Sequence, residues 1–383
     1  MHRPLDGVRV LEVAQFTFVP AAGAVLADWG ADVIKIENPV TGDPQRGLVN
    51  VLGRATTVPG SAFAPIIEAP NRGKRSIALG LAVAEARPVL EELIRRSDVF
   101  LTSYLPTARA KLHIDVDDVR RINPDIIYVA GSGFGSEGPD RDTGAYDSTA
   151  FWARGGSADG VTCSDAEHVA FMPAGAYGDN IAALALAGGM SDALRPILAL
   201  LAGGSLPKID RHTQAPGNPL TGNYRTSDGY VIQLSMLQPA RYWPEFCRLM
   251  GCDEFAHDSR FESVEALAEH ADAAYAIVRE AIGSRTFDQC AQLLRRTTGQ
   301  WAPVQDPWDV GNDEALIANG RIVDVVDAEG KPRKLVANPV KFDDPPLALT
   351  RAPQFAEHTD DVLREIGVDD QRLTELKFAG AIT

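Results

Sequence analysis

The sequence contains few cysteines, and their placement excludes a disulfide framework. Four occur among 383 residues, at Cys163, Cys247, Cys252 and Cys290. Their spacing is irregular, and no Cys-x-x-Cys pair of the kind that binds zinc is present. We therefore expect reduced thiols and no bound metal.

Long apolar runs are also lacking. No stretch reaches the roughly 18 consecutive apolar residues that a transmembrane helix needs. The opening letters, MHRPLDGVRV, have no basic segment followed by the apolar run of a signal peptide. The sequence therefore predicts a cytoplasmic protein with no membrane span.

Positive charge is in deficit. The chain has 37 lysine and arginine residues against 52 aspartate and glutamate residues, a formal net charge of −15. Because neutralising phosphates requires a broad basic surface, we expect no nucleic acid and no anionic membrane as partner. Three small basic clusters have the size of a nucleotide-phosphate site, although solvated helix ends and loops look the same in sequence: Arg72 with Lys74 and Arg75, Arg95 with Arg96, and Arg109 with Lys111.

The N-terminal half has the alternating pattern of an α/β fold. Residues 8–14 and 31–37 read as apolar strands on either side of an alanine-rich helix that ends at Gly30. Such a unit is nearly always parallel and right-handed. Helices near 83–96 and 116–122 each precede another apolar strand. We predict a Rossmann-like large domain with a parallel sheet.

The composition of the sequence changes after residue 205, where a Pro/Gly/Asn-rich stretch begins. Since 383 residues exceed one typical core, two lobes are expected. The strand 230–236 and helices near 241–250, 263–282 and 287–297 suggest a smaller α+β lobe. The tail predicts one last helix with Thr359 as its N-cap. The assignment is therefore a large Rossmann-like, ligand-binding domain over 1–205, a linker and small domain over 206–335, and a C-terminal segment over 336–383 that returns to the large domain.

Four glycines follow a predicted strand, at Gly131, Gly133, Gly135 and Gly138. A dinucleotide-binding loop would open a helix here, but the chain continues into the turn-forming letters GPDRDTG. Two interpretations remain. The glycines allow backbone amides to approach an acyl or pantetheine chain, or they form a plain tight turn.

A second motif, Gly178, Asp179 and Asn180, precedes a helix of small apolar residues. An aspartate at such a place is most often a helix cap. The helix, however, has the composition of a buried one, so the carboxylate could also be presented to a ligand as a nucleophile at the positive end of the helix dipole. Gly178 removes side-chain bulk beside it.

Together these blocks resemble the family III CoA-transferases, a group that also contains α-methylacyl-CoA racemase. The likeness rests on PLDGVRVLEVAQFTFVPAAGAVLADWGADVIKIENPVTGD, NRGKRSIALGL, GSGFGSEGPDRDTGAYD, GDN and EHTDDVLREIG, in the family's order over nearly the whole chain. The resemblance implies an interlocked homodimer. It also implies that Asp179 attacks an acyl-CoA thioester to form a mixed anhydride and then an aspartyl-CoA thioester, with a free carboxylic acid as acceptor. No cofactor is implied beyond coenzyme A as substrate and product.

One position separates the transferases from the racemases. Racemases of the family have a Gly-His-Asp motif where this sequence has Gly144, Ala145, Tyr146 and Asp147. Tyrosine removes the group that titrates near neutral pH, which favours a transferase. The resemblance gives Tyr146 and Asp147 supporting roles in the active site, with Gly133, Gly135 and Thr17. A racemase and a non-catalytic acyl-CoA-binding protein remain the alternatives.

The resemblance also proposes contacts to coenzyme A. Lys111 matches a phosphate-binding residue, Tyr104 and Leu79 match the adenine pocket, and Asn38 replaces an arginine. Thr17 replaces a glutamine between two phenylalanines, which indicates a more apolar acyl group. After Met190 the sequence lacks about two dozen residues that the family pattern contains. We interpret this gap as residues missing from the sequence as printed, and not as a deletion in the protein itself. The predicted CoA-binding set is Arg72, Lys74, Arg75, Leu79, Tyr104, Lys111 and Asn38.

Overall fold

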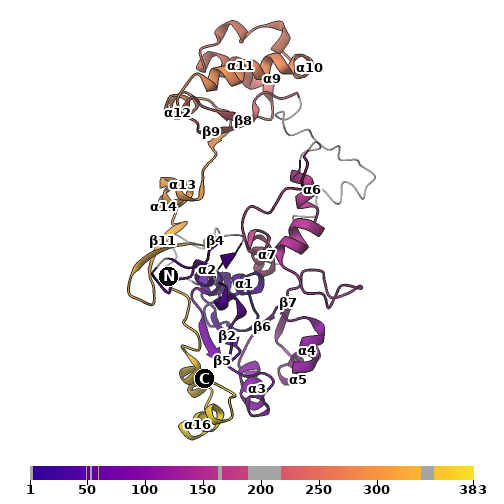
Figure 1. Ribbon diagram of the computed structural model, residues 1–383, viewed down its shortest axis with the longest axis vertical. Helices are drawn as coiled ribbons and strands as arrows, with labels where there is room; N and C mark the ends of the chain where they lie inside the picture. The colour runs from indigo at the N-terminus through magenta and orange to yellow at the C-terminus, as the bar shows by residue number, and fades with distance from the viewer. Residues whose placement is uncertain are drawn as a thin grey trace. The chain divides into compact units, whose positions relative to one another are not determined.

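The structure, a computed structural model, describes most of the chain (Figure 1). The described residues are 3–48, 50–51, 54–58, 60–162, 166–188, 217–337 and 349–383. The chain divides into two compact units, each considered over its described residues. The first comprises Met1–Asp159, Ala170–Leu198 and Asp313–Thr383, and the second Gly160–Val169 and Ala199–Asn312.

A five-stranded parallel sheet forms the centre of the first unit. Its order is β5-β2-β1-β6-β7, and neighbouring strands are parallel throughout. This confirms the predicted parallel α/β fold. The strands are β1 (Arg9–Val13), β2 (Asp32–Glu37), β5 (Arg75–Ala78), β6 (Val99–Thr102) and β7 (Ile127–Ala130).

Helices cover both faces of this sheet, because successive residues of a strand point to opposite sides. Leu11 belongs to a core with α3, α5, α15 and α16, whereas Val10 belongs to a core with α1. Gly23 of α1 passes so close to the sheet that a Cβ atom there would lie 2.0 Å from Glu12 Oε2. The helices of the first unit are α1 (Phe18–Asp28), α2 (Pro65–Asn71), α3 (Arg87–Arg95), α4 (Pro106–Leu112), α5 (Val116–Ile122), α7 (Tyr177–Gly188), α14 (Glu314–Ala318), α15 (Thr359–Glu365) and α16 (Asp370–Phe378).

The C-terminal segment differs from its prediction. Two helices, α15 and α16, stand where one was expected, and Gly367 (φ +95°) lies between them. Thr359 is the first residue of α15 and His358 is its N-cap. The Thr359 hydroxyl instead accepts a hydrogen bond from the Ala78 amide (2.9 Å) and so ties α15 to β5.

A hairpin also belongs to the first unit. Its strands β11 (Ile322–Val326) and β12 (Pro332–Val336) place Val325 and Leu335 against Phe63. The predicted boundary at residue 335 falls inside this hairpin, while the boundary at residue 205 and the segment after Met190 lie outside the described residues. The short pair β3 (Asn50–Val51) and β4 (Arg54–Ala55) completes the described strands of the unit.

The second unit combines helices with an antiparallel sheet. Its antiparallel sheet has the order β10-β9-β8, with Trp243 and Phe246 among the fully buried core residues. The helix expected over 263–282 is two helices, because Ser263 caps the first and His270 interrupts them. The elements are β8 (Thr221–Arg225), β9 (Val231–Ser235), α9 (Pro239–Leu249), α10 (Val264–Glu269), α11 (Ala271–Gly283), α12 (Phe287–Leu294), β10 (Trp301–Pro303) and α13 (Pro307–Asn312), while α6 (Ser157–Val161) joins the two units in sequence.

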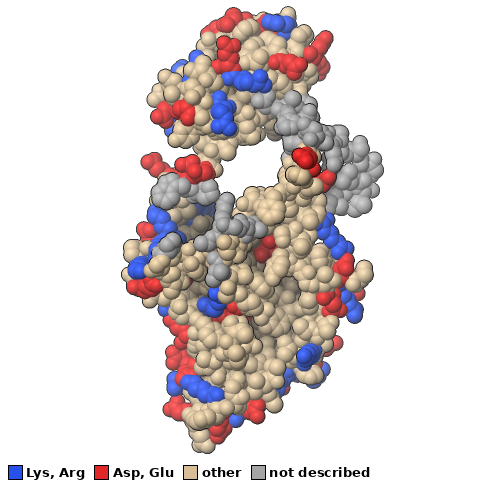
Figure 2. Space-filling model, viewed as in Figure 1, with Lys and Arg blue, Asp and Glu red and all other residues tan. Residues whose placement is uncertain are grey.

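Charges of both signs are interspersed on one face of the molecule. Figure 2 shows lysine and arginine side chains next to aspartate and glutamate on the visible face, with uncharged residues between them. Among the described helices, none is both long and apolar enough to cross a membrane.

Candidate active site

A pocket of about 920 Å³ opens at the carboxyl ends of β1, β6 and β7. The sheet order reverses direction between β1 and β6, and this switch point is where open α/β sheets bind ligands. The pocket walls come from the loops that follow these strands, from residues 144–151 and from the start of α7. The lining includes Gln15, Phe16, Phe18, Ser103, Tyr104, Gly131, Gly133, Tyr146, Asp147, Phe151, Gly178 and Asp179.

Asp179 lies inside α7 rather than before it. The helix begins at Tyr177, so the carboxylate is in the first turn and not at the expected N-cap position. It accepts no hydrogen bond from any described residue, which removes the capping interpretation. The side chain is half-buried in the pocket wall. Burial, and secondarily the nearby charge of Asp147, raise the pKa of Asp179 to about 7.

Asp147 is a buried companion of Asp179. Its Oδ2 accepts a hydrogen bond from the Gly178 amide (3.1 Å) and its Oδ1 accepts one from the Ser148 amide (2.9 Å). The first bond ties the start of α7 to the pocket wall. Gly178 is required for packing, because a Cβ atom there would lie 2.6 Å from the Phe151 ring. The π-helix Ser148–Arg154 that supplies Phe151 had no signal in the sequence.

Tyr146 stands at the pocket with 57% of its surface exposed. Its ring meets the ring of Phe16 edge-on, with centroids 5.2 Å apart and an interplanar angle of 88°. Phe16 has a positive φ of 62°, a backbone conformation that is unusual for a bulky residue. An aromatic pair therefore borders the same pocket as Asp179.

Gly131 and Gly133 of the glycine loop line the pocket, whereas Gly135 is not among its lining residues. Gly133 is in close contact, since a Cβ atom there would come within 2.4 Å of Ala145 Cβ. Gly135 has φ +89°, and its amide donates to Ser132 Oγ at 3.0 Å. No helix follows these glycines within 131–146, which agrees with rejecting a dinucleotide-binding loop.

Two of the predicted CoA contacts, Tyr104 and Asn38, follow the carboxyl ends of strands, and a third, Lys111, lies in α4. Tyr104 lines the pocket, and its hydroxyl accepts a hydrogen bond from Gln15 Nε2 (3.2 Å). Lys111 is exposed in the last turn of α4. Asn38 is exposed after β2, where its side chain accepts hydrogen bonds from the amides of Val40 and Thr41.

The other predicted CoA contacts do not line this pocket. Arg72 is buried and paired with Asp28 at 2.6 Å. Arg75 is paired with Asp32 and Glu365, each at 2.6 Å. Lys74 is fully enclosed, and Leu79 belongs to the hydrophobic core of the sheet. Because carboxylates from elsewhere in the fold already pair with these cations, we leave them out of the proposed site. Thr17 is also buried and accepts a hydrogen bond from Gln45 Nε2 (2.9 Å).

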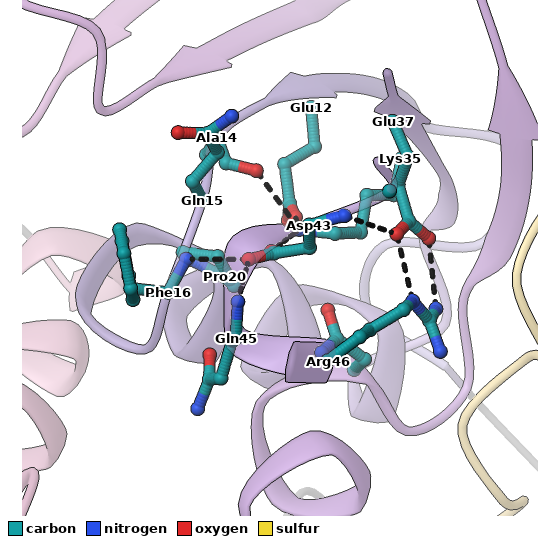
Figure 3. A network of polar contacts seen from close by, with 12 residues as sticks. Glu12, Ala14, Gln15, Phe16, Pro20, Lys35, Glu37, Asp43, Gln45 and Arg46 are labelled. Atoms are coloured by element: carbon teal, nitrogen blue, oxygen red, sulfur yellow. Dashed lines mark hydrogen bonds and ion pairs between the residues drawn. The ribbon is translucent and has the colours of Figure 1, made fainter. Parts of the chain in front are cut away.

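Behind the pocket lies a buried network of charged side chains that sequence reasoning missed (Figure 3). Lys35 Nζ contacts three oxygens: Ala14 O at 2.9 Å, Glu12 Oε1 at 3.2 Å and Asp43 Oδ2 at 2.9 Å. Glu12 Oε2 also pairs with Lys74 Nζ at 2.6 Å. One feature of the sequence could have indicated this network: each of two apolar strands, VLEV and VIKIE, contains a charged residue.

The network balances its own charge. Glu37 accepts two hydrogen bonds from Arg46 at 2.8 Å, and together they extend the network beyond Asp43. Arg46 outweighs the effect of burial and lowers the pKa of Glu37 to about 2. Burial lowers the pKa of Lys74 to about 8, whereas the surrounding carboxylates overcome burial and hold the pKa of Lys35 above its usual value. Three carboxylates thus face three cations inside the fold. Among the residues that the structure describes, no group of three or more His, Cys, Asp or Glu side chains is arranged to hold a metal ion.

This geometry defines the class of the protein. It has an α/β fold, with a carboxylate-bearing pocket at the switch point of its sheet. The sequence matches the CoA-transferase family III over residues 5–199 and 195–359. The chain belongs to this family, and we identify it as an enzyme of the CoA-transferase type.

Relatives match over almost their full lengths. An (R)-2-hydroxy-4-methylpentanoate CoA-transferase of Clostridioides difficile is 28% identical, over 97% of this chain and 98% of the relative. A cinnamoyl-CoA:phenyllactate CoA-transferase of Clostridium sporogenes is 29% identical, over 97% and 95%. The crystal structure of a CaiB/BaiF family protein from Brucella suis superposes with a TM-score of 0.76 at 26% identity, covering 96% of this chain and 100% of the other.

Proposed function

We propose that the protein transfers coenzyme A from an acyl thioester to a free carboxylate through covalent catalysis by Asp179. The observation that carries this proposal is a half-buried carboxylate in the pocket wall that accepts no hydrogen bond from the described residues. A carboxylate without such partners keeps its lone pairs for attack on a bound carbonyl.

The proposed reaction conserves the activated acyl group at each step. An Asp179 oxygen attacks the donor's acyl carbonyl, the carbon–sulfur bond breaks, and CoA leaves as a thiolate from a mixed anhydride. The thiolate attacks the Asp179 carbonyl, which releases the donor acid and leaves an aspartyl-CoA thioester. The acceptor carboxylate displaces the thiolate to form a second anhydride. The thiolate then attacks the acceptor's acyl carbon and regenerates Asp179.

Each addition creates an oxyanion that needs a hydrogen-bond donor. The amides of Gly131 and Gly135 are engaged with Thr102 O and Ser132 Oγ. Gly133 lines the pocket, and its amide donates to no described residue. We assign the Gly133 amide as an oxyanion donor, and Tyr146 and Asp147 as residues that support the geometry around Asp179.

The proposed substrates are apolar carboxylic acids. Phe16, Phe18, Tyr146 and Phe151 line the pocket that contains Asp179. The two relatives are named for a branched aliphatic 2-hydroxy acid and for aromatic acids, which is consistent with such a lining. Tyr104 and Lys111 are candidates for the nucleotide end of CoA, and we keep the homodimer and the cytoplasmic location as predictions.

Hydroxylamine trapping tests the covalent mechanism. The protein is incubated with 4-methylpentanoyl-CoA, cinnamoyl-CoA or acetyl-CoA and then with hydroxylamine, and peptides are analysed by mass spectrometry. We expect a hydroxamate on Asp179, because an aspartyl anhydride or thioester reacts with this nucleophile. Deuterium uptake at the α-carbon without any adduct would instead support the racemase alternative. Binding of CoA thioesters with neither signal would support a non-catalytic binding protein.

The pH profile gives a second prediction. Because the pKa of Asp179 is raised to about 7, the nucleophilic anion is lost as the pH falls below that value. We expect kcat/KM for the donor to fall about tenfold per unit below pH 6.5 and to level off above pH 7.5. Replacing Asp147 with asparagine removes a like charge and should move the inflection to lower pH. A profile that stays flat from pH 5.5 to 8 would contradict this assignment.

A further inference from the structure

Residues 14–17 connect β1 to α1, and each of them makes a hydrogen bond to a residue outside this segment. Ala14 O accepts from Lys35 Nζ (2.9 Å), and the Gln15 amide donates to Ser103 Oγ (3.0 Å). The Phe16 amide donates to Asp43 Oδ1 (3.2 Å). Gln45 holds the next residue, Thr17, as described above. This segment carries Phe16 into the pocket lining.

Asp43 joins this segment to the buried network. Its side chain is buried, with 2% of the residue exposed, and Figure 3 shows it between Phe16, Lys35 and Gln45. Oδ1 accepts from the amides of Phe16 and Gln45, at 3.2 and 3.0 Å. Oδ2 lies 2.9 Å from Lys35 Nζ. One carboxylate thus holds the backbone of Phe16 at a fixed distance from strand β2.

This contact is needed because Phe16 has a conformation that it would not adopt alone. A left-handed φ is costly for a phenylalanine, and such strain persists only where surrounding contacts impose it. In this conformation the Phe16 ring packs edge-on against Tyr146 at the pocket. Without the bond to Asp43, the backbone would be free to relax and the ring would lose its position.

We propose that Asp43 is a positioning residue for acyl selectivity: it holds Phe16 in a strained conformation, and the Phe16 ring selects apolar acyl groups in the pocket. Lys35 supports Asp43 by neutralising its charge and orienting Oδ2. The proposal rests on the proposed use of this pocket by the acyl group of a CoA thioester, but it does not depend on turnover.

A double-mutant cycle measured by binding tests the proposal. Full-length Asp179→Asn protein serves as background, so that thioesters are not consumed. The readout is the ratio of the dissociation constants of acetyl-CoA and 4-methylpentanoyl-CoA. Phe16→Ala should lower this selectivity ratio about tenfold, as expected for the loss of one packed ring. Asp43→Ala should lower it by a similar factor. The double variant should show no further decrease, because Asp43 acts through Phe16.

Two variants separate positioning from general stability. Asp43→Asn keeps an oxygen for the Phe16 amide and should retain most of the selectivity ratio, although it loses the ion pair with Lys35. Asp28→Ala removes another buried carboxylate, the partner of Arg72 at the far end of α1, and should leave the ratio unchanged. If Asp43→Ala does not fold, Asp43→Ser replaces it, since a single oxygen cannot reproduce both contacts.

Several outcomes would overturn the proposal. These are an unchanged ratio in Asp43→Ala, additive effects in the double variant, a loss in Asp43→Asn equal to that in Asp43→Ala, or no acyl preference in the background protein. If hydroxylamine traps Asp179 and the selectivity ratio is unchanged in Asp43→Ala, only the role of Asp43 is rejected and covalent transfer stands. A negative trap together with the expected ratios would reject covalent transfer and leave the role of Asp43 intact.

Discussion

Replacement of Asp179 by alanine is expected to reduce CoA transfer by at least about 10³-fold, because it removes the atom that forms the covalent intermediate. Binding of CoA thioesters should change little, since the pocket has many other lining residues and the Asp179 carboxylate bonds to no described residue. The measurements are steady-state transfer rates by chromatography of the acyl-CoA products, and dissociation constants by calorimetry. Alanine is preferred to asparagine for the rates, because it cannot revert to aspartate by deamidation.

Asn180 provides the matched control. It is the next residue in the same helical turn, it is exposed, and its side chain donates to Ala176 O (2.8 Å) without lining the pocket. Asn180→Ala should retain transfer within a few-fold of the parent protein. If Asp179→Ala keeps more than a trace of transfer, covalent catalysis by this residue is excluded. If both variants are equally impaired, the loss reflects disturbance of α7.

Replacement of Lys35 by methionine should destabilise the first unit by about 3–5 kcal/mol, because it removes the cation that pairs with the buried Asp43, while Glu12 keeps its pair with Lys74. The Lys35 and Glu12 side chains are 0% exposed and that of Asp43 is 2% exposed, so water cannot compensate. The penalty should appear in hydrogen exchange of peptides from β1 and β2. This measurement reports on the first unit directly, whereas global unfolding of a chain with two units need not be two-state.

Arg75→Met is the control for this prediction. Arg75 also pairs with two carboxylates, Asp32 and Glu365, but these side chains are 35% and 46% exposed. Solvent screens such pairs, so the cost should be about 1 kcal/mol or less. Equal effects of Lys35→Met and Arg75→Met would show that the buried network contributes no more than a surface ion pair.

The general architecture could be read from the sequence because it depends on local periodicity. Apolar strands alternating with helices predicted the parallel sheet, and the glycines after β7 and the GDN motif pointed to segments that do meet at one pocket. The sequence predicted the ends of helices less accurately than their presence. Asp179 was expected to precede α7 but lies within it, because the residues that start a helix are also acceptable inside its first turn.

The basic cluster at Arg72, Lys74 and Arg75 shows what local pattern does not reveal. In the sequence it resembles an exposed phosphate site, yet the structure pairs each cation with a carboxylate from another part of the fold. Glu12, the partner of Lys74, is 62 residues away in the chain. Burial and pairing depend on which segments meet in space, and one-dimensional spacing does not contain that information.

The sequence by itself determined the class of fold, the family and the segments that carry the candidate nucleophile, since these follow from periodicity and ordered motifs. Tertiary structure alone decided that Asp179 has no hydrogen-bond partner among the described residues, that Asp147 lies near enough to raise its pKa, and that Asp43 holds Phe16 against Tyr146. The physical reason is that hydrogen bonding, desolvation and charge coupling depend on distances across the fold, and folding brings together residues that the chain separates.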